Sequence, residues 1–236
     1  MNVLVVVPTY NERENLPVLA RGILAYDGYR VLVVDDGSPD GTGQAAEDLK
    51  TEYPDRVDVM HRTGPRGLGR SYIDGLRHAL TMPDIDLICQ MDADLSHGPE
   101  YLPALAAAAA AGDMAIGSRY LHGISVVNWP LHRIMLSAFA NRYIRAITGL
   151  RASDCTGGFR CWRREALARL PLDTMVSEGY SFVVEMLFEA VRRGCRVEEV
   201  PIIFVERRQG HSKLSNGVLM ESLIMPWRLR LRGRLR

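Results

Sequence analysis

Two carboxylates separated by one residue follow a short apolar run in the stretch ICQMDADLSHGPE, residues 88–100. At the end of an extended strand, Asp92 and Asp94 would face the same side because they stand at positions i and i+2. Oxygen ligands in this arrangement suit a hard divalent cation such as Mg²⁺ or Mn²⁺. A metal there would cancel the charge that builds on the diphosphate of a departing nucleotide. Taken alone, such a pair is more often two solvated or helix-capping acids at the start of a loop.

A second acidic pair strengthens the metal interpretation. Asp35 and Asp36 directly follow the β-branched run VLVV at 31–34. Adjacent strand residues point to opposite faces, so we expect only Asp36 to contact a ligand and Asp35 to cap or buttress the loop. The next residues, GSPDGT, are typical of a turn that leads into a helix. Acids at several strand ends would repel a bare phosphate, but they suit a metal ion or the hydroxyls of ribose and sugar.

The elements that must position these acids alternate between strand and helix. β-Branched runs at 3–7 and 31–34 are typical of strands buried on both faces of a parallel sheet, with an amphipathic helix between them. The alternation continues with strands expected at 57–61, 86–92 and 113–120, and with helices expected after the GSPDGT turn and over 69–80 and 104–111. We therefore predict an α/β fold with an open, doubly wound, mostly parallel sheet. Its ligands should bind beyond the carboxyl ends of the strands.

Composition narrows the class of protein. The 236 residues, 47% hydrophobic and 24% charged, fit a globular chain with a real core, and a net charge of +1 argues against nucleic acid as the main partner. The four cysteines form no CxxC pair and are read as apolar residues of a reducing compartment. The apolar run at the N-terminus has no basic region before it, so we expect a first core strand and no signal peptide. No uninterrupted run of 18 apolar residues occurs, so at a membrane the chain would lie on the surface.

After about residue 120 the sequence becomes helical, Arg-rich and amphipathic, most clearly over 131–147 and 180–194. Five arginines and no acid occupy the last ten residues: Arg228, Arg230, Arg232, Arg234 and Arg236. This cluster suggests affinity for an anionic surface. A frayed, solvated tail is an equally good interpretation.

Seven motifs follow one another along the chain: VVPTYNERENL, VLVVDDGSPDGT, MDADLSHGPE, GSRY, SDCTGGFRCWRREAL, EGYSFVVEML and VEEVPIIFVERRQGHSKLS. In this order they resemble glycosyltransferase family 2 and, within it, the dolichyl-phosphate or polyprenyl-phosphate mannose synthases. The resemblance extends from residue 3 to about residue 216. The first three motifs are specific to the broad family, whereas the last four, with their spacing, indicate a polyprenyl-phosphate acceptor.

The resemblance implies a Rossmann-like catalytic domain of the GT-A type that transfers mannose from GDP-mannose to a polyprenyl, dolichyl-type monophosphate. It implies a Mg²⁺ or Mn²⁺ cofactor and inversion at the anomeric carbon. We expect a single domain, with a nucleotide-sugar-binding half over 1–120, an acceptor half with amphipathic interface helices over 121–216, and a basic C-terminal helix or tail over 217–236. The enzyme is expected to be cytoplasmic and peripheral on the cytoplasmic face of the membrane, and a membrane-protein partner remains open.

Matching motif by motif, the resemblance also implies the site residues. The donor would be bound by Pro8, Tyr10, Glu12, Val34, Asp36, Asp92, the backbone of Ala93, Asp94, Arg119, Arg207 and Lys213. The metal would be held mainly by Asp94, with Asp92 and Ser96. The acceptor phosphate would meet Arg119, Arg133 and Ser137, the last two at i and i+4 on one helix face. Asp94, Arg119 and Arg133 are the expected catalytic residues.

The acceptor explains why no general base is sought. A monophosphate has a second pKa of about 6, so it is largely dianionic at neutral pH and already an oxygen nucleophile. The site must then use cations to hold the two anions, donor and acceptor, close together.

Three alternatives to this function remain. The same fold could transfer glucose or GlcNAc from a UDP-sugar, or the chain could be a non-catalytic nucleotide-sugar-binding module. It could also be a phospho-receiver module, although the acidic pair of such a module should follow the first strand rather than the second. His97 and His211 lack partners at ligand spacing and are expected to be loop or structural residues.

Overall fold

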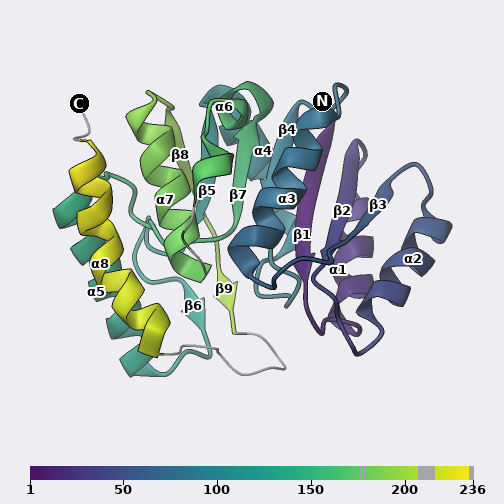
Figure 1. The fold of residues 1–236 in the computed structure, drawn as a ribbon, viewed down its shortest axis with the longest axis horizontal. Coiled ribbons are helices and arrows are strands. Elements are labelled where there is room, and N and C mark those ends of the chain that lie inside the picture. Colours follow the sequence, from purple (N-terminus) through teal and green to yellow (C-terminus); the bar gives the residue numbers. More distant parts are fainter. Residues whose placement is uncertain (176, 178, 207–215, 234–236) are drawn as a thin grey trace.

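A mixed sheet forms the centre of the molecule and helices cover both of its faces (Figure 1). The structure, a computed structural model, describes residues 1–175, 177, 179–206 and 216–233. The sheet has seven strands in the order β3-β2-β1-β4-β7-β5-β8. Of these strands, β7 runs antiparallel to both of its neighbours and the other pairings are parallel. The predicted α/β fold with a mostly parallel sheet is confirmed.

The N-terminal elements follow the predicted alternation. They are β1 (Val3–Thr9), α1 (Asn15–Leu24), β2 (Tyr29–Asp35), α2 (Thr42–Glu52), β3 (Val57–His61), α3 (Leu68–Thr81), β4 (Leu87–Gln90), the 3₁₀ turn η1 (Pro99–Tyr101), α4 (Leu102–Ala111) and β5 (Met114–Ser118). Every residue of β1 is buried, because helices cover both faces of the sheet there. Apolar clusters accordingly fill both sides of the sheet.

The C-terminal elements complete the sheet and add two helices beyond its edge. They are β6 (Val126–Val127), α5 (Leu131–Thr148), β7 (Arg160–Arg163), α6 (Arg164–Ala168), the 3₁₀ turn η2 (Leu172–Thr174), α7 (Gly179–Arg192), β8 (Val197–Pro201), β9 (Phe204–Val205) and α8 (Asn216–Arg232). Because β7 lies between β4 and β5, both predicted halves of the chain contribute to one sheet. The division at residue 120 stays a prediction.

Helices α5 and α8 lie side by side at the end of the molecule opposite β3 (Figure 1). Exposed apolar side chains stand on both helices, including Met135 and Phe139 on α5 and Leu223 and Trp227 on α8. Among the described helices, none combines the length and apolarity that a membrane crossing requires. The small sheet β6-β9 connects this end of the molecule to the strand ends described next.

Candidate active site

The carboxyl ends of the parallel strands meet at one edge of the sheet. Asp36, just after β2, donates its backbone N–H to the carbonyl of Thr9 at the end of β1 (3.0 Å). Met91, just after β4, donates to the carbonyl of Val6 (3.2 Å). Arg119 directly follows β5. The topology therefore brings the predicted donor and metal residues of several motifs to one edge.

Short hydrogen bonds fix the Asp92–Asp94 loop. The Tyr72 hydroxyl donates to Oδ1 of Asp92 (2.8 Å). Asp94 Oδ1 accepts from both the backbone N–H (3.1 Å) and the hydroxyl (2.5 Å) of Ser96. Leu95, between them, has φ +61°, a left-handed conformation that residues with a side chain seldom adopt and that is often found at functional sites. The loop thus holds two carboxylates one residue apart at the end of β4.

The buried side chain of His97 supports the Asp92–Asp94 loop through a hydrogen bond to its backbone. The Nδ1 of His97 accepts the backbone N–H of Asp92 (3.2 Å). Its ring stacks on Phe159 (4.9 Å between centroids) and meets the edge of Phe204 (5.5 Å). Burial lowers the pKa of His97, which keeps the imidazole neutral and its Nδ1 able to accept. The expected structural part for His97 is confirmed, whereas His211 lies outside the described residues.

The donor set at this loop fits Mg²⁺ or Mn²⁺. Within the described residues, no three His, Cys, Asp or Glu side chains are grouped closely enough to form a complete metal cage. Such ions bind through one or two carboxylates and take their other ligands from water and substrate phosphates. Asp92 and Asp94 are the two carboxylates of this loop that could do so, and Ser96 donates to Asp94; their binding of an ion stays a prediction. Whether Ser96 also contacts the ion stays a prediction.

The two acids at the end of β2, Asp35 as its last residue and Asp36 directly after it, have different environments, as expected. Asp35 accepts from the hydroxyl (2.6 Å) and the backbone N–H (3.3 Å) of Ser38, so it buttresses the turn. Asp36 forms a buried ion pair with Arg62 and accepts the backbone N–H of Gly67 (2.9 Å). Two donors from the β3–α3 segment therefore fix the carboxylate that was assigned to the nucleoside.

The remaining donor residues line the ends of β1 and β2. Pro8 and Val34 are buried and stand opposite each other in the strand register. The Tyr10 hydroxyl accepts from Arg66 (2.7 Å), whose guanidinium lies 4.7 Å from the centre of the tyrosine ring. Glu12 Oε2 accepts from the side chain of Asn15 (2.7 Å). These contacts place the side chains at the expected edge, and their binding of a donor stays a prediction.

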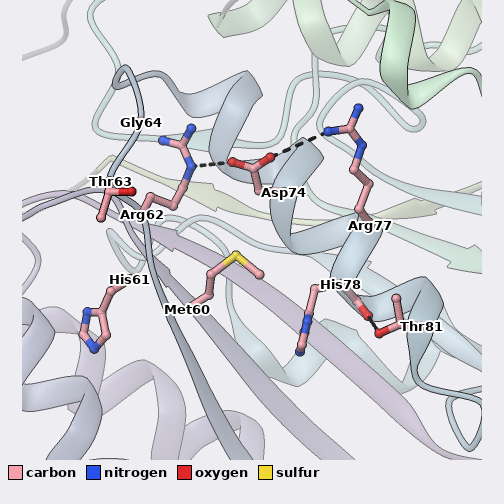
Figure 2. Close-up of a pocket in the computed structure, with 9 residues that line it drawn as sticks. All are labelled: Met60, His61, Arg62, Thr63, Gly64, Asp74, Arg77, His78 and Thr81. Atoms are coloured by element: carbon pink, nitrogen blue, oxygen red, sulfur yellow. Dashed lines mark hydrogen bonds and ion pairs between the residues drawn. The ribbon is translucent and has the colours of Figure 1, made fainter.

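A hollow of about 470 Å³ lies between β3 and α3, beside this edge (Figure 2). Its lining includes His61 from β3 and His78 from α3, but none of the predicted site residues. Arg62 connects the two places, because its Nε donates to Asp74 in the hollow (2.7 Å) while its Nη1 pairs with Asp36. The hollow therefore lies next to Asp36, which is predicted to bind the nucleoside, and we do not regard it as the reaction site.

Arg119 is held by a carboxylate that the sequence did not single out. Its Nε and Nη2 donate to the two oxygens of Asp154 (2.6 and 2.7 Å), and Nη2 also donates to Thr156 (2.8 Å). Burial alone would raise the pKa of Asp154, but the adjacent Arg119 guanidinium holds it below its usual value. The ion pair is buried, so the guanidinium plane of Arg119 is fixed.

Two of the three predicted acceptor residues, Arg119 and Arg133, meet at Trp129, and Ser137 is linked to Arg119 through Tyr120. The Arg133 guanidinium lies 4.1 Å from the centre of the Trp129 rings, and that of Arg119 lies 5.6 Å from it. Ser137 accepts a hydrogen bond from the hydroxyl of Tyr120 (2.7 Å), a residue whose ring contacts Arg119 (5.5 Å). The structure therefore brings together Arg119, Arg133 and Ser137 from two segments of the chain.

Sequence reasoning missed four residues of this region: Tyr120, Trp129, Asp154 and Glu206, the last paired with Arg133. Tyr120, Asp154 and Glu206 stood inside quoted motifs, but nothing in the spacing marked them as partners of Arg119 or Arg133. Only the approach of strand ends far apart in the sequence reveals these pairs. Arg207 and Lys213 lie outside the described residues, so their predicted contacts with the donor phosphates stay predictions.

Comparisons with known proteins identify the family of the chain. The sequence model of Glycosyl transferase family 2 matches residues 4–170. A polyprenol monophosphomannose synthase of Mycolicibacterium smegmatis is 46% identical over 234 residues, which is 98% of this chain and 88% of that protein. An undecaprenyl-phosphate mannosyltransferase of Micrococcus luteus is also 46% identical, over 225 residues, 95% of this chain and 92% of that protein.

Solved glycosyltransferase structures share the fold at low sequence identity. Glucosyl-3-phosphoglycerate synthase of Mycobacterium tuberculosis, solved with Mn²⁺, UDP and glucosyl-3-phosphoglycerate, has a TM-score of 0.66 and 17% identity, covering 98% of this chain and 79% of that one. A mannosyltransferase of Pyrobaculum calidifontis, solved with GDP-Man and Mn²⁺, has a TM-score of 0.62 and 21% identity, covering 100% of this chain and 66% of that one. The GT-A fold prediction is thereby confirmed. The chain carries carboxylates at its strand ends, its residues 4–170 match the family model, and two relatives are 46% identical to it. It therefore belongs to glycosyltransferase family 2.

Proposed function

We propose that this enzyme transfers mannose from GDP-mannose to a polyprenyl monophosphate, with inversion at the anomeric carbon. The observation that carries the proposal is the convergence of Arg119 and Arg133 on Trp129. The Ser137 hydroxyl accepts from Tyr120, whose ring contacts Arg119. Two guanidiniums and a hydroxyl suit the dianionic phosphate of such an acceptor. The names of the two relatives at 46% identity support the same acceptor class and mannose as the sugar.

The acceptor region touches the donor loop through Phe204. Its ring lies 5.5 Å from the Arg119 guanidinium and 5.5 Å from the His97 ring. The backbone N–H of Val205 also donates to the carbonyl of Ser96 (3.4 Å). A phosphate held at Arg119 would therefore lie beside the loop that carries Asp92 and Asp94, as transfer between two phosphates requires.

In the proposed reaction, an oxygen of the acceptor phosphate attacks the anomeric carbon of mannose as the bond from that carbon to the GDP β-phosphate oxygen breaks. The products are GDP and polyprenyl phosphate mannose, and no proton has to be removed because the nucleophile is already anionic. Asp94 and Asp92 would hold Mg²⁺ or Mn²⁺, which when bound neutralises charge on the leaving diphosphate. Arg119 and Arg133 would fix the acceptor phosphate against the repulsion of the donor.

Asp36 would bind the nucleoside of the donor. Arg62 and the N–H of Gly67 hold its carboxylate, so its orientation is set before the donor arrives. Tyr10, Glu12, the backbone of Ala93 and the segment with Arg207 and Lys213 would complete the donor site.

We further propose that the enzyme works on the cytoplasmic face of a membrane, where α5 and α8 lie on the lipid. Phe139 on α5 is 61% exposed and Trp227 on α8 is 53% exposed, and Tyr143 connects them by ring stacking and by accepting the indole N–H (2.9 Å). Exposed arginines such as Arg142 and Arg228 stand on the same two helices. Apolar side chains with basic neighbours are typical of helices that bind anionic lipid surfaces.

The proposal is tested by incubating the enzyme separately with radiolabelled GDP-mannose, UDP-glucose and UDP-GlcNAc, in the presence of polyprenyl phosphates and Mg²⁺ or Mn²⁺. Label should enter the organic extract only from GDP-mannose. Asp94→Asn should abolish this transfer, whereas Asp27→Asn, an exposed acid at the opposite edge of the sheet, should leave it unchanged. Transfer from a UDP-sugar instead would assign another sugar to the same fold, and full turnover by Asp94→Asn would contradict the metal site.

A further inference from the structure

The indole N–H of Trp129 is buried but has no hydrogen-bond partner among the described residues. Burying such a donor without an acceptor costs about 1–3 kcal/mol. The indole is therefore not held in place by its own hydrogen bond, and a ligand oxygen would remove the cost. Trp129 lies between β6 and α5, directly before the helix that carries Arg133 and Ser137.

The rings of Trp129 contact two cations. The Arg133 guanidinium is 4.1 Å from the centre of the indole and the Arg119 guanidinium is 5.6 Å from it, and Phe204 packs its ring at 5.4 Å. Two guanidiniums this close to one residue repel each other, and an aromatic face offsets part of that repulsion. Because a stacked guanidinium directs its N–H groups outward in its own plane, stacking occupies its face and not its edge, where Asp154 accepts from Arg119 and Glu206 accepts from Arg133. A bound phosphate would meet the two guanidiniums beside these carboxylates.

Each cation is fixed on a second side by a carboxylate. Asp154 holds Arg119 and Glu206 holds Arg133, so the tryptophan is the contact that the two arginines share. A side chain in this position determines how far apart the two guanidiniums lie. That separation decides whether one phosphate can meet both.

We propose that Trp129 is an acceptor-binding residue: its ring sets the spacing of Arg119 and Arg133, and its N–H donates to the bound phosphate. This inference rests on the proposed function, since it takes these arginines as the acceptor site. The expected consequence falls mainly on the acceptor, because Trp129 contacts Arg119 and Arg133, and of these two only Arg119 is also assigned to the donor.

The test compares Trp129→Phe, which keeps an aromatic face and removes the N–H, with Trp129→Leu, which removes both. KM for a polyprenyl phosphate should rise a few-fold in Trp129→Phe and at least tenfold in Trp129→Leu, with a smaller rise in KM for GDP-mannose. The dissociation constant of a short-chain polyprenyl phosphate, measured by calorimetry in the full-length enzyme, should rise in the same order. Tyr26→Leu removes an aromatic ring that lies tilted against the ring of Tyr29 at the far edge of the sheet, and it serves as the control.

The activity of the wild-type enzyme in the same assay distinguishes a failure of the proposed function from a failure of the inference about Trp129. If it fails to transfer mannose to the lipid phosphate, the proposed function is wrong. If it transfers mannose but Trp129→Leu leaves the acceptor KM unchanged, or raises the donor KM equally, the inference about Trp129 is wrong. A Trp129→Phe variant with wild-type acceptor affinity would overturn the part assigned to the N–H.

Discussion

Arg119 and Asp154 form a bidentate ion pair that is closed off from solvent, with Nε–Oδ2 at 2.6 Å and Nη2–Oδ1 at 2.7 Å. Asp154 also accepts the backbone N–H of Arg119 (3.1 Å), so the carboxylate fixes both the main chain and the guanidinium. The arginine predicted to meet phosphates is therefore oriented before any substrate binds. Such preorganisation lowers the reorganisation needed during the reaction.

Replacing Asp154 with Asn should lower both stability and activity. The change leaves the buried Arg119 charge without its counterion, which typically costs about 3–5 kcal/mol of unfolding free energy. We expect kcat/KM to fall on the order of 100-fold, as when an oriented transition-state donor is lost. Urea unfolding and the lipid-extraction assay measure the two effects. Asp84→Asn, which breaks a more exposed pair with Arg30, should cost no more than about 1 kcal/mol and retain activity. A fully active Asp154→Asn enzyme would show that Arg119 needs no orientation.

The fold was largely predictable because local sequence patterns indicate the strands and helices of its first half. The β-branched runs that became β1 and β2 are buried on both faces, and the helix spacing of Leu16, Leu19 and Ile23 places all three in the core. β7 was not anticipated, since RCWR at 160–163 is short and bears two arginines. Its place is set by a tertiary contact, in which the Trp162 indole donates to Gln90 of β4 (2.8 Å).

From residue spacing alone, the candidate site was predictable only where its chemistry is local, whereas Arg119, Arg133 and Ser137 were named through the family resemblance. Asp92 and Asp94 stand out in the sequence because they are one residue apart at an expected strand end, and the acidic pair at 35–36 strengthens the metal interpretation. The pairing of Arg133 with Glu206, by contrast, joins positions 73 residues apart. No periodicity or motif spacing encodes such an approach, which follows from the packing of β6 against β9.

Alkaline pH should destabilise the enzyme partly through Cys155. Burial raises the pKa of this thiol from 9.0 to about 12. The thiol ionises more readily in the unfolded chain, so its contribution to stability is full below pH 9 and is lost as pH rises toward 12. Cys155→Ala should reduce the loss of unfolding free energy between pH 8 and pH 10 by about 1 kcal/mol. Urea titrations at the two pH values measure this difference. Ser181→Ala, which truncates a buried, non-titrating hydroxyl, should leave the loss unchanged; an equal effect of both variants would contradict the assignment.

Replacing Phe139 on α5 with Ser should weaken binding to vesicles that contain anionic lipid. A phenylalanine side chain that leaves water for lipid contributes about 1.5–3 kcal/mol, so the partition coefficient should fall about tenfold or more. Co-sedimentation with the vesicles at low and high salt measures the apolar and the charge contributions separately. Val18→Ser is the matched control, because Val18 is equally exposed (both 61%) but stands on α1.

Removing residues 228–236 should weaken binding to the same vesicles mainly at low salt, since five arginines are lost. Unchanged partitioning of both the Phe139 variant and the truncated chain would rule out the α5–α8 surface as the membrane contact and place the lipid phosphate's entry elsewhere.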